Sequence, residues 1–140
     1  MFLLDTNVIS ELRKAKSRRA DPQVLKWAGS VAAPTLYISV ISVLELEMGV
    51  LRIERRDARQ GALLRTWLEQ QVLRNFQYRI LAVDVPVVRR CAQLHIPNPC
   101  SDRDALIAAT ALIHGMTLVT RNTHDFQSSG ALLLNPWIAG

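Results

Sequence analysis

Residues 104–122, DALIAATALIHGMTLVTRN, indicate most directly how this chain folds. The first part is an apolar run with helical spacing, which predicts a helix over 102–114, and Gly115 directly after it is typical of a helix C-terminus. A short apolar strand is predicted next, over 117–120. A buried helix that leads into a buried strand is the repeating unit of an α/β protein.

The same alternation extends outward to both ends of the chain. Short apolar segments predict strands at 2–4, 36–40, 80–83, 117–120 and 131–134. Longer segments predict helices at 6–14, 21–31, 42–52, 54–76, 85–95 and 102–114. Nearly continuous apolar strands separated by helices favour a parallel sheet covered on both faces. With 140 residues and no interdomain linker, the chain is expected to form one domain over 1–140.

Composition narrows the class of protein further. The chain is 49% hydrophobic, but no apolar stretch approaches the roughly 20 residues of a membrane span, so no membrane association is expected. Asp5 interrupts the apolar start and argues against a signal peptide. The two cysteines, Cys91 and Cys100, lack the spacing of metal ligands and are expected to be reduced thiols. Together these observations predict a cytoplasmic protein.

Four carboxylates stand at the borders of apolar segments. Asp5 ends the run MFLLD, Glu45 follows LYISVISVL, Asp104 opens DALIAATALI, and Asp125 follows TLVTRNTH. A carboxylate beside a core is costly unless its charge is compensated. Ligands of open parallel sheets bind beyond the carboxyl ends of the strands, where these four acids can converge. The pattern therefore predicts one site that holds divalent cations, and we call the four acids the acidic quartet.

Each of these acids also has a purely structural interpretation. Asp5 could cap a helix that begins at Thr6, and the segments 42–45 and 101–104 both match a capping box. Asp125 could form a turn. For any one acid alone the cap or the turn is the better explanation. Only the joint placement of all four favours a functional site.

Two further acids are expected to be structural. Asp84 ends a predicted strand and Pro86 follows it, which is typical of a helix N-cap. Asp102 lies two residues before Asp104, and on a helix this spacing turns the two side chains ~200° apart. Both cannot face one ion, so Asp102 is assigned to a cap or to the surroundings of the site.

Basic side chains form two groups along the chain. One lies within 13–19, and the other consists of Arg52, Arg55, Arg56 and Arg59, whose 3- and 4-residue steps would place them on one face of a single helix. Basic groups on either side of an acidic centre favour contact with a polyanion. Alternatively, the arginines of the second group form a solvated surface or contact a protein partner.

The combined motifs resemble the PIN domain and, within that family, the VapC-type toxins of bacterial type II toxin–antitoxin pairs. The resemblance rests on four segments that occur in family order: LLDTNVIS, SVLELEMGV, DALIAATALIHGMTLVTRN and THDF. It extends from residue 1 to about 136, and the region 52–79 is its least similar part.

The resemblance implies a PIN-like fold, with a central parallel sheet of about five strands flanked by helices on both faces, commonly as a homodimer. It implies an endoribonuclease that depends on Mg²⁺ or Mn²⁺, acts on an RNA substrate and is inhibited by a co-encoded antitoxin, VapB-like or similar. Operator DNA would be bound through that antitoxin. Asp5, Glu45, Asp104 and Asp125 match the acids of the family, and the supporting positions are Thr6, Asn7, Ser42, Thr120, Arg121 and Asn122.

Carboxylates without Cys or His partners suit Mg²⁺ better than zinc. We expect Asp5 and Asp104 to form the principal metal pair, while Glu45 and Asp125 hold a second ion or orient its water ligands. The cation would activate a water for in-line attack on a phosphodiester. The group Arg52, Arg55, Arg56 and Arg59 is the candidate contact for the RNA backbone, with a dimer or antitoxin contact as the alternative.

Two other functions are alternatives to this one. The first is a PIN-fold protein that acts mainly with its antitoxin as an operator-DNA-binding complex and has little nuclease activity. The second is phosphotransfer through Asp5, which is disfavoured because Thr6 and Asn7 supply no second acid and no lysine occurs after Lys26.

Overall fold

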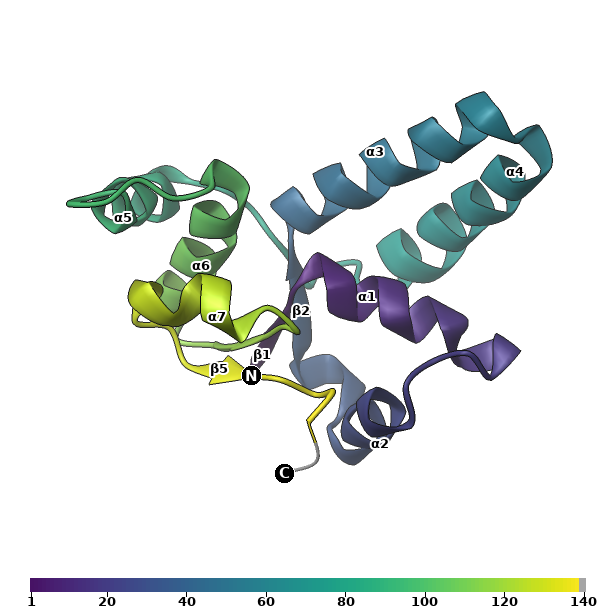
Figure 1. Cartoon of the computed structure of the whole chain (residues 1–140), viewed down its shortest axis with the longest axis horizontal. Coiled ribbons are helices and arrows are strands. Elements are labelled where there is room, and N and C mark those ends of the chain that lie inside the picture. Colours follow the sequence, from purple (N-terminus) through teal and green to yellow (C-terminus); the bar gives the residue numbers. More distant parts are fainter. Residues whose placement is uncertain (139–140) are drawn as a thin grey trace.

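A five-stranded parallel sheet forms the centre of the protein in a computed structural model that describes residues 1–138 (Figure 1). Its strands are β1 (Phe2–Leu4), β2 (Leu36–Ser39), β3 (Ile80–Leu81), β4 (Thr117–Val119) and β5 (Leu133–Leu134). They follow the order β3-β2-β1-β4-β5, and every neighbouring pair is parallel. The predicted parallel α/β sheet is therefore confirmed, although β3 and β5 are shorter than the segments predicted for them.

Seven α-helices surround this sheet within the described residues: α1 (Thr6–Arg13), α2 (Pro22–Ser30), α3 (Val40–Arg56), α4 (Ala58–Thr66), α5 (Val85–Leu94), α6 (Asp102–His114) and α7 (Thr123–Phe126). Three 3-10 turns (Lys14–Ser17, Ala33–Thr35 and Gln127–Ser129) and a π-helical segment (Trp67–Leu73) complete the elements. Figure 1 shows α1, α2 and the α3–α4 hairpin on one side of the sheet and α5, α6 and α7 on the other. No helix within residues 1–138 is long and apolar enough to cross a membrane.

The boundary between α3 and α4 differs from the predicted helices at 42–52 and 54–76. In the structure α3 continues to Arg56, and Asp57 separates it from α4. The N–H of Asp57 donates to Ile53 O at 2.8 Å, and its carboxylate accepts from the N–H of Gln60 at 3.1 Å. One residue thus ends the first helix and caps the second, because an aspartate side chain can satisfy the free N–H groups of a helix start.

The two helices of this hairpin pack closely where Gly61 faces Glu54. A Cβ atom at Gly61 would lie 2.5 Å from Glu54 Cα, so only glycine fits there without a shift of the backbone. The sequence predicts a helix boundary near residue 53. Helical periodicity does not predict the close packing at Gly61, because that contact depends on how the two helices lie against each other.

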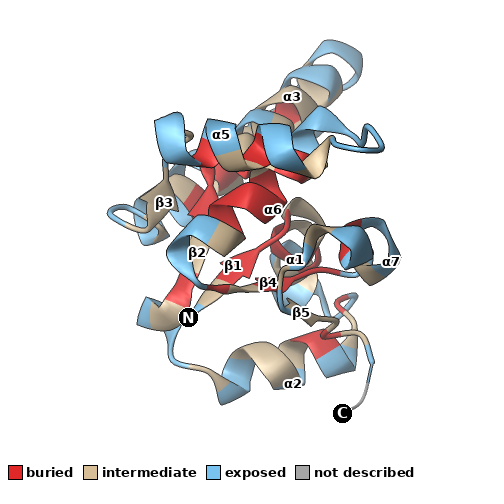
Figure 2. Ribbon diagram, turned by 90° about the vertical axis from the view of Figure 1, so that its left-hand side faces the viewer, coloured by how far each residue is buried: buried red, intermediate tan, exposed pale blue. Residues whose placement is uncertain are grey.

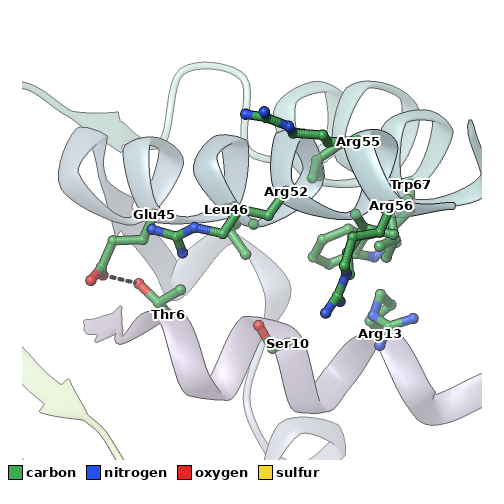
Figure 3. A pocket seen from close by; sticks show the side chains of 13 residues that line it. Thr6, Ser10, Arg13, Glu45, Leu46, Arg52, Arg55, Arg56 and Trp67 are labelled. Carbon is green, nitrogen blue, oxygen red and sulfur yellow. Dashed lines mark hydrogen bonds between the residues drawn. The ribbon is translucent and has the colours of Figure 1, made fainter. Parts of the chain in front are cut away.

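A groove of about 690 Å³ lies between α1 and the α3–α4 hairpin (Figure 3). Leu46, Val50 and Trp67 form much of its apolar wall. In Figure 3 the guanidinium of Arg52 extends along the groove toward Glu45. The groove therefore runs from the basic part of α3 to one of the four predicted site acids.

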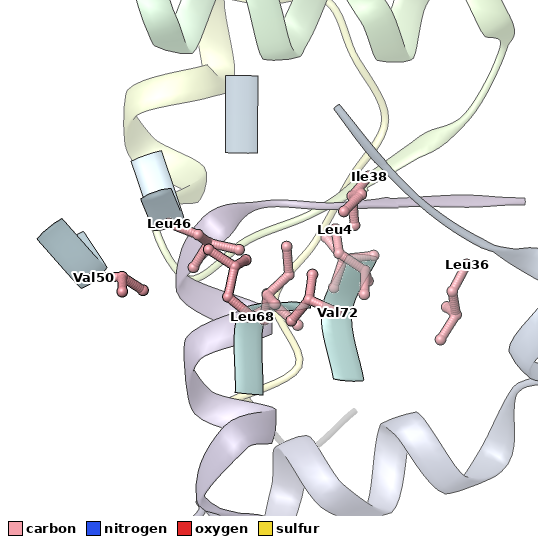
Figure 4. Packing of buried hydrophobic residues seen from close by; sticks show 10 residues of the cluster. Leu4, Leu36, Ile38, Leu46, Val50, Leu68 and Val72 are labelled. Atoms are coloured by element: carbon pink, nitrogen blue, oxygen red, sulfur yellow. The ribbon is translucent and has the colours of Figure 1, made fainter. Parts of the chain in front are cut away.

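The hydrophobic core lies on both faces of the sheet, because neighbouring strand residues point to opposite sides. Leu4 and Ile38 pack with Leu68 beneath the hairpin (Figure 4), whereas Leu3 and Leu118 pack against α6. Figure 2 shows buried segments in the central strands and in α6. Each fully buried leucine stabilises the fold by about 1.5–3 kcal/mol. This packing fixes the position of the carboxyl end of β1 relative to that of β4.

The cysteines follow the prediction. Cys91 is buried in α5, Cys100 is exposed, and both are free thiols.

Candidate active site at the ends of strands β1 and β4

Asp5 occupies the point where the sheet order reverses direction. From β1 the chain builds one side of the sheet through β2 and β3 and then returns to place β4 on the other side of β1. Crevices at such switch points, beyond the carboxyl ends of the strands, are where open α/β sheets bind ligands. Asp5 directly follows β1 and Thr120 directly follows β4, and both side chains are buried.

The Asp5 carboxylate is held by a hydrogen bond to each oxygen. Oδ1 accepts from the N–H of Thr6 at 2.8 Å, and Oδ2 accepts from the hydroxyl of Thr120 at 2.7 Å. The first of these bonds makes Asp5 the N-cap of α1. The structural interpretation of Asp5 is therefore correct, and the cap leaves the residue at the ligand-binding edge of the sheet.

The pKa values of two quartet members reflect burial and mutual repulsion. Burial is the largest cause that raises the pKa of Asp5, the hydrogen bonds from Thr120 and Thr6 oppose it, and the charges of Asp104 and Glu45 raise it further. Burial also raises the pKa of Asp104, followed by the charges of Glu45 and then Asp125. Asp5, Glu45 and Asp104 are thus close enough for their charges to interact, and Asp125 acts on Asp104, so a cation among them would relieve that repulsion.

Glu45 reaches the site from the second turn of α3. The capping-box interpretation of 42–45 is wrong, because α3 begins at Val40 and Ser39 caps it by accepting from the N–H of Ile41 at 3.0 Å. The predicted helix over 42–52 would place Glu45 in its first turn, and the start of α3 at Val40 shows that this is wrong. Glu45 Oε1 instead accepts from the hydroxyl of Thr6 at 2.7 Å.

Thr6 therefore joins two acids of the quartet. Its backbone N–H supports Asp5, as expected, and its hydroxyl contacts Glu45 and the buried Ser42, whose Oγ is 3.0 Å away. Ser42 lies close to the second acid, as predicted, although Thr6 mediates the link.

Asp104 and Asp125 line a second cavity, of about 330 Å³, on the other side of this crevice. Asp104 lies in the first turn of α6, as predicted, and is half-buried. Ser101 occupies the N-cap position, but its side chain makes no capping hydrogen bond, so no complete capping box forms there. Asp125 is exposed in the short helix α7.

The loop after β4 forms the remaining corner of the site. Thr120 Oγ1 accepts from the N–H of Asn122 at 3.0 Å, and the N–H of Arg121 donates to Asn7 Oδ1 at 3.4 Å. The side chain of Arg121 stacks on Trp137, with 5.2 Å between the guanidinium carbon and the ring centroid. The structure thus brings Asn7, Thr120 and Asn122 into one hydrogen-bonded loop and engages Arg121 with the C-terminal segment.

The donor chemistry suits a magnesium-type ion, because the quartet offers only carboxylate oxygens and its neighbours offer hydroxyl groups. Within residues 1–138, however, no three His, Cys, Asp or Glu side chains are arranged closely enough to hold a metal ion. The Thr120 hydroxyl donates to Asp5 and the Thr6 hydroxyl donates to Glu45, while the negative charges of Glu45 and Asp104 repel that of Asp5. The residue types fit such an ion, although in the described part of the chain these side chains are not gathered around one point.

Comparison with known proteins shows the family of this chain. Residues 2–130 match the PIN domain profile. The chain belongs to the PIN domain family. The VapC ribonuclease Y4jK of Sinorhizobium fredii is 38% identical to it over 142 residues, which cover 98% of each protein. Toxin FitB of Neisseria gonorrhoeae is 38% identical over 144 residues, covering 98% of this chain and 99% of FitB. In a structure of FitAB bound to a DNA fragment, one chain matches with a TM-score of 0.89 and 34% identity, covering 100% of this chain and 98% of that one.

These relatives group this PIN domain with the VapC- and FitB-type toxins, so the resemblance predicted from the four sequence segments is confirmed. The match extends through the region 52–79, which the motifs alone had left least similar.

The predicted structural acids of this PIN domain lie outside the quartet. Asp84 caps α5 by accepting from the N–H of Val87 at 3.2 Å, as expected. Asp102 directs its side chain, which is 90% exposed, toward His95, with 3.3 Å between Oδ1 and Nε2.

The predicted arginine face of the PIN domain is only partly correct. Arg52, Arg55 and Arg56 lie on α3 and line the groove, but Arg59 lies on α4 beyond the break at Asp57. Figure 3 also shows Arg55 directed away from α1. The four side chains therefore do not share one helix face.

Arg103 is a site neighbour that sequence reasoning missed. Its Nη1 lies 3.7 Å from Glu45 Oε2, and its charge opposes the rise in the Asp104 pKa. The available signal was a basic residue directly before Asp104. On a helix, however, adjacent residues point ~100° apart, so only the packing of α3 beside α6 reveals the contact.

Proposed function

We propose that this PIN domain is the toxin of a type II toxin–antitoxin pair and acts as a metal-dependent endoribonuclease. One observation carries the proposal: the buried carboxylate of Asp5 lies at the switch point of the sheet, and its pKa is raised by burial and, to a lesser extent, by the charges of Asp104 and Glu45. Perturbed acids in a crevice are typical of functional sites. Similarity to a protein named as a VapC ribonuclease supports the reaction class.

Each quartet member has a role in this proposal. Asp5 and Asp104 would hold the principal cation, Mg²⁺ or Mn²⁺, and Glu45 and Asp125 would hold a second ion or orient its ligands. When bound, such a cation lowers the pKa of a coordinated water and neutralises charge on the phosphoryl group.

The surrounding side chains keep these acids in place. The Thr120 hydroxyl and the Thr6 N–H fix the carboxylate plane of Asp5, and the Thr6 hydroxyl holds Glu45. Such neighbours orient ligands and raise the precision of a metal site. Asn7 and Asn122 stabilise the loop that carries Thr120.

RNA would approach the site along the groove. Arg52 is the favoured backbone contact because it extends toward Glu45, and Arg56 lies farther along the same groove (Figure 3). Arg55 and Arg59 are weaker candidates, since one points away from α1 and the other lies on α4. Contacts of this kind position an RNA strand without reading its sequence.

A second function has an observation in its favour. The chain is similar to FitB, and the similar solved chain comes from a FitAB complex bound to DNA. The protein would then act, as a cytoplasmic homodimer, mainly with a VapB-like antitoxin on operator DNA. The groove beside α1 would take part of that antitoxin, and nuclease activity would be slight.

One experiment separates the two functions. The purified chain is incubated with a mixed RNA substrate and Mg²⁺, with a parallel sample in EDTA. Discrete fragments that disappear in EDTA support the nuclease. Intact RNA, together with a complex that binds operator DNA when the product of the neighbouring short reading frame is added, supports the second function.

A further inference from the structure

Arg103 places a positive charge at the edge of the acidic quartet. The residue follows Asp102 in the first turn of α6, and its side chain is 47% exposed. Its Nη1 lies 3.7 Å from Glu45 Oε2 and 3.8 Å from Met48 Sδ, so it spans the gap between α6 and α3. Among the ion pairs formed by residues 1–138, this is the one that includes a quartet acid.

The pair is weak enough to exchange. At 3.7 Å its atoms are beyond good hydrogen-bond distance, and both side chains have access to solvent. Exposed pairs of this kind contribute little to stability. A divalent cation beside Glu45 would therefore displace the guanidinium, because the two positive charges repel and the ion binds the carboxylate more strongly.

We propose that Arg103 changes partners in the reaction cycle: it pairs with Glu45 in the cation-free protein and turns to the RNA phosphate once the cation is bound. This inference rests on the proposed nuclease function. A guanidinium offers several N–H donors in a planar fork that matches two phosphate oxygens. Its contact with Glu45 places that fork at the edge of the acidic quartet, where a bound phosphate would lie in the proposed reaction.

A merely structural bridge between α3 and α6 predicts a different behaviour. If Arg103 only tied the helices together, its removal would loosen Glu45 and leave cation affinity unchanged or weaker. If Arg103 competes with the cation, its removal strengthens cation binding. The sign of the change separates the two roles.

The first measurement is Mn²⁺ affinity, by calorimetry or by the electron paramagnetic resonance of free Mn²⁺, without RNA. For Arg103→Gln we expect about two- to fivefold tighter binding, which corresponds to the free energy of an exposed ion pair. Arg103→Lys should bind Mn²⁺ like the wild type because it keeps the charge. Arg59→Gln is the matched control for loss of an arginine charge on α4, and its affinity should not change.

The second measurement is the salt dependence of binding to a labelled single-stranded RNA, in EDTA and in Ca²⁺, with the RNA confirmed intact after each titration. In Ca²⁺, the slope of log K against log salt should be shallower by about 0.7 in Arg103→Gln, the value for one phosphate contact on a single strand. In EDTA the wild type and the variant should have equal slopes, since Arg103 is then paired with Glu45.

Unchanged or weaker Mn²⁺ binding in Arg103→Gln would overturn the role of Arg103, even if the wild type cleaves RNA normally. Equal RNA slopes in Ca²⁺ would overturn its phosphate contact. Tighter Mn²⁺ binding in a chain that does not cleave RNA would support the competition and reject the nuclease, so the two proposals fail separately.

Discussion

Thr120 donates its hydroxyl to Asp5 Oδ2 at 2.7 Å, across 115 positions of sequence and in the buried interior. This hydrogen bond joins the ends of β1 and β4, the two strands that flank the switch point. With the N–H of Thr6 on the other oxygen, it engages both oxygens of a carboxylate whose pKa is raised by burial. The orientation of the Asp5 carboxylate therefore depends on a residue that lies far away in the sequence.

Replacing Thr120 with valine should destabilise the metal-free protein by about 1–3 kcal/mol, because a buried carboxylate oxygen loses its partner. The loss of this bond raises the Asp5 pKa further, so the penalty should be smaller at pH 5 than at pH 7.5. Urea unfolding in EDTA at the two pH values measures the effect. Thr110→Val is the matched control, since the buried Thr110 hydroxyl donates only to Leu106 O of its own helix; a pH-dependent loss of the same size there would contradict the argument.

The pH dependence of stability should report the raised pKa of Asp5. A carboxyl group whose folded pKa exceeds its unfolded value, about 3.9 for Asp, binds its proton more tightly when folded. Its contribution to stability is therefore present at low pH and is lost as pH rises through the folded pKa. Asp5→Asn lacks this loss, so its free energy of unfolding relative to the wild type should increase as pH rises from about 4 toward neutrality in EDTA. A difference that stays constant with pH would show that Asp5 ionises as easily in the folded protein as in the unfolded chain.

Catalysis should separate Asp104 from its neighbour Asp102. Loss of residues that only support metal ligands typically costs 10–100-fold, so removal of a ligand should cost more than about a hundredfold. We expect Asp104→Asn and Asp5→Asn to lose Mg²⁺-dependent RNA cleavage by at least that factor while the far-ultraviolet circular dichroism stays unchanged. Asp102→Asn should remain close to the wild type because its side chain is 90% exposed and faces His95. Full activity in either of the first two variants would remove that acid from the proposed site, and an equal loss in Asp102→Asn would show that Asp102 is the ligand.

The α3–α4 hairpin allows a paired test at two glycines. Alanine is favoured over glycine inside helices by roughly 0.5–1 kcal/mol. Gly49→Ala should gain about that amount, because nothing lies within 4 Å of the new Cβ. Gly61→Ala should instead lose about 1–3 kcal/mol, since its Cβ would lie 2.5 Å from Glu54 Cα. Thermal unfolding of both variants checks the opposite signs, and a gain at both positions would mean that the two helices separate easily.

Local sequence was sufficient for the features that depend on near neighbours. The end of β1 at Asp5, the N-cap at Asp84 and the first-turn position of Asp104 all follow from apolar runs and capping preferences within about one helical turn. The same local patterns carried the resemblance to the PIN domain, and the match over residues 2–130 confirmed it.

Contacts between distant segments depend on how the helices pack on the sheet. The Thr6 hydroxyl meets Glu45, Thr120 meets Asp5, and Arg103 meets Glu45, across separations that no helical or strand period relates. The start of α3 also differs from the local pattern. Residues 42–45 match a capping box, but Ser39 caps the helix and α3 begins at Val40. Short-range preferences choose among local conformations, whereas the burial of strand and helix faces fixes which side chains meet. For this protein, the four acids of the candidate site could be proposed from the sequence, whereas their hydrogen-bond and ion-pair partners followed only from the packing of β1, β4, α3 and α6.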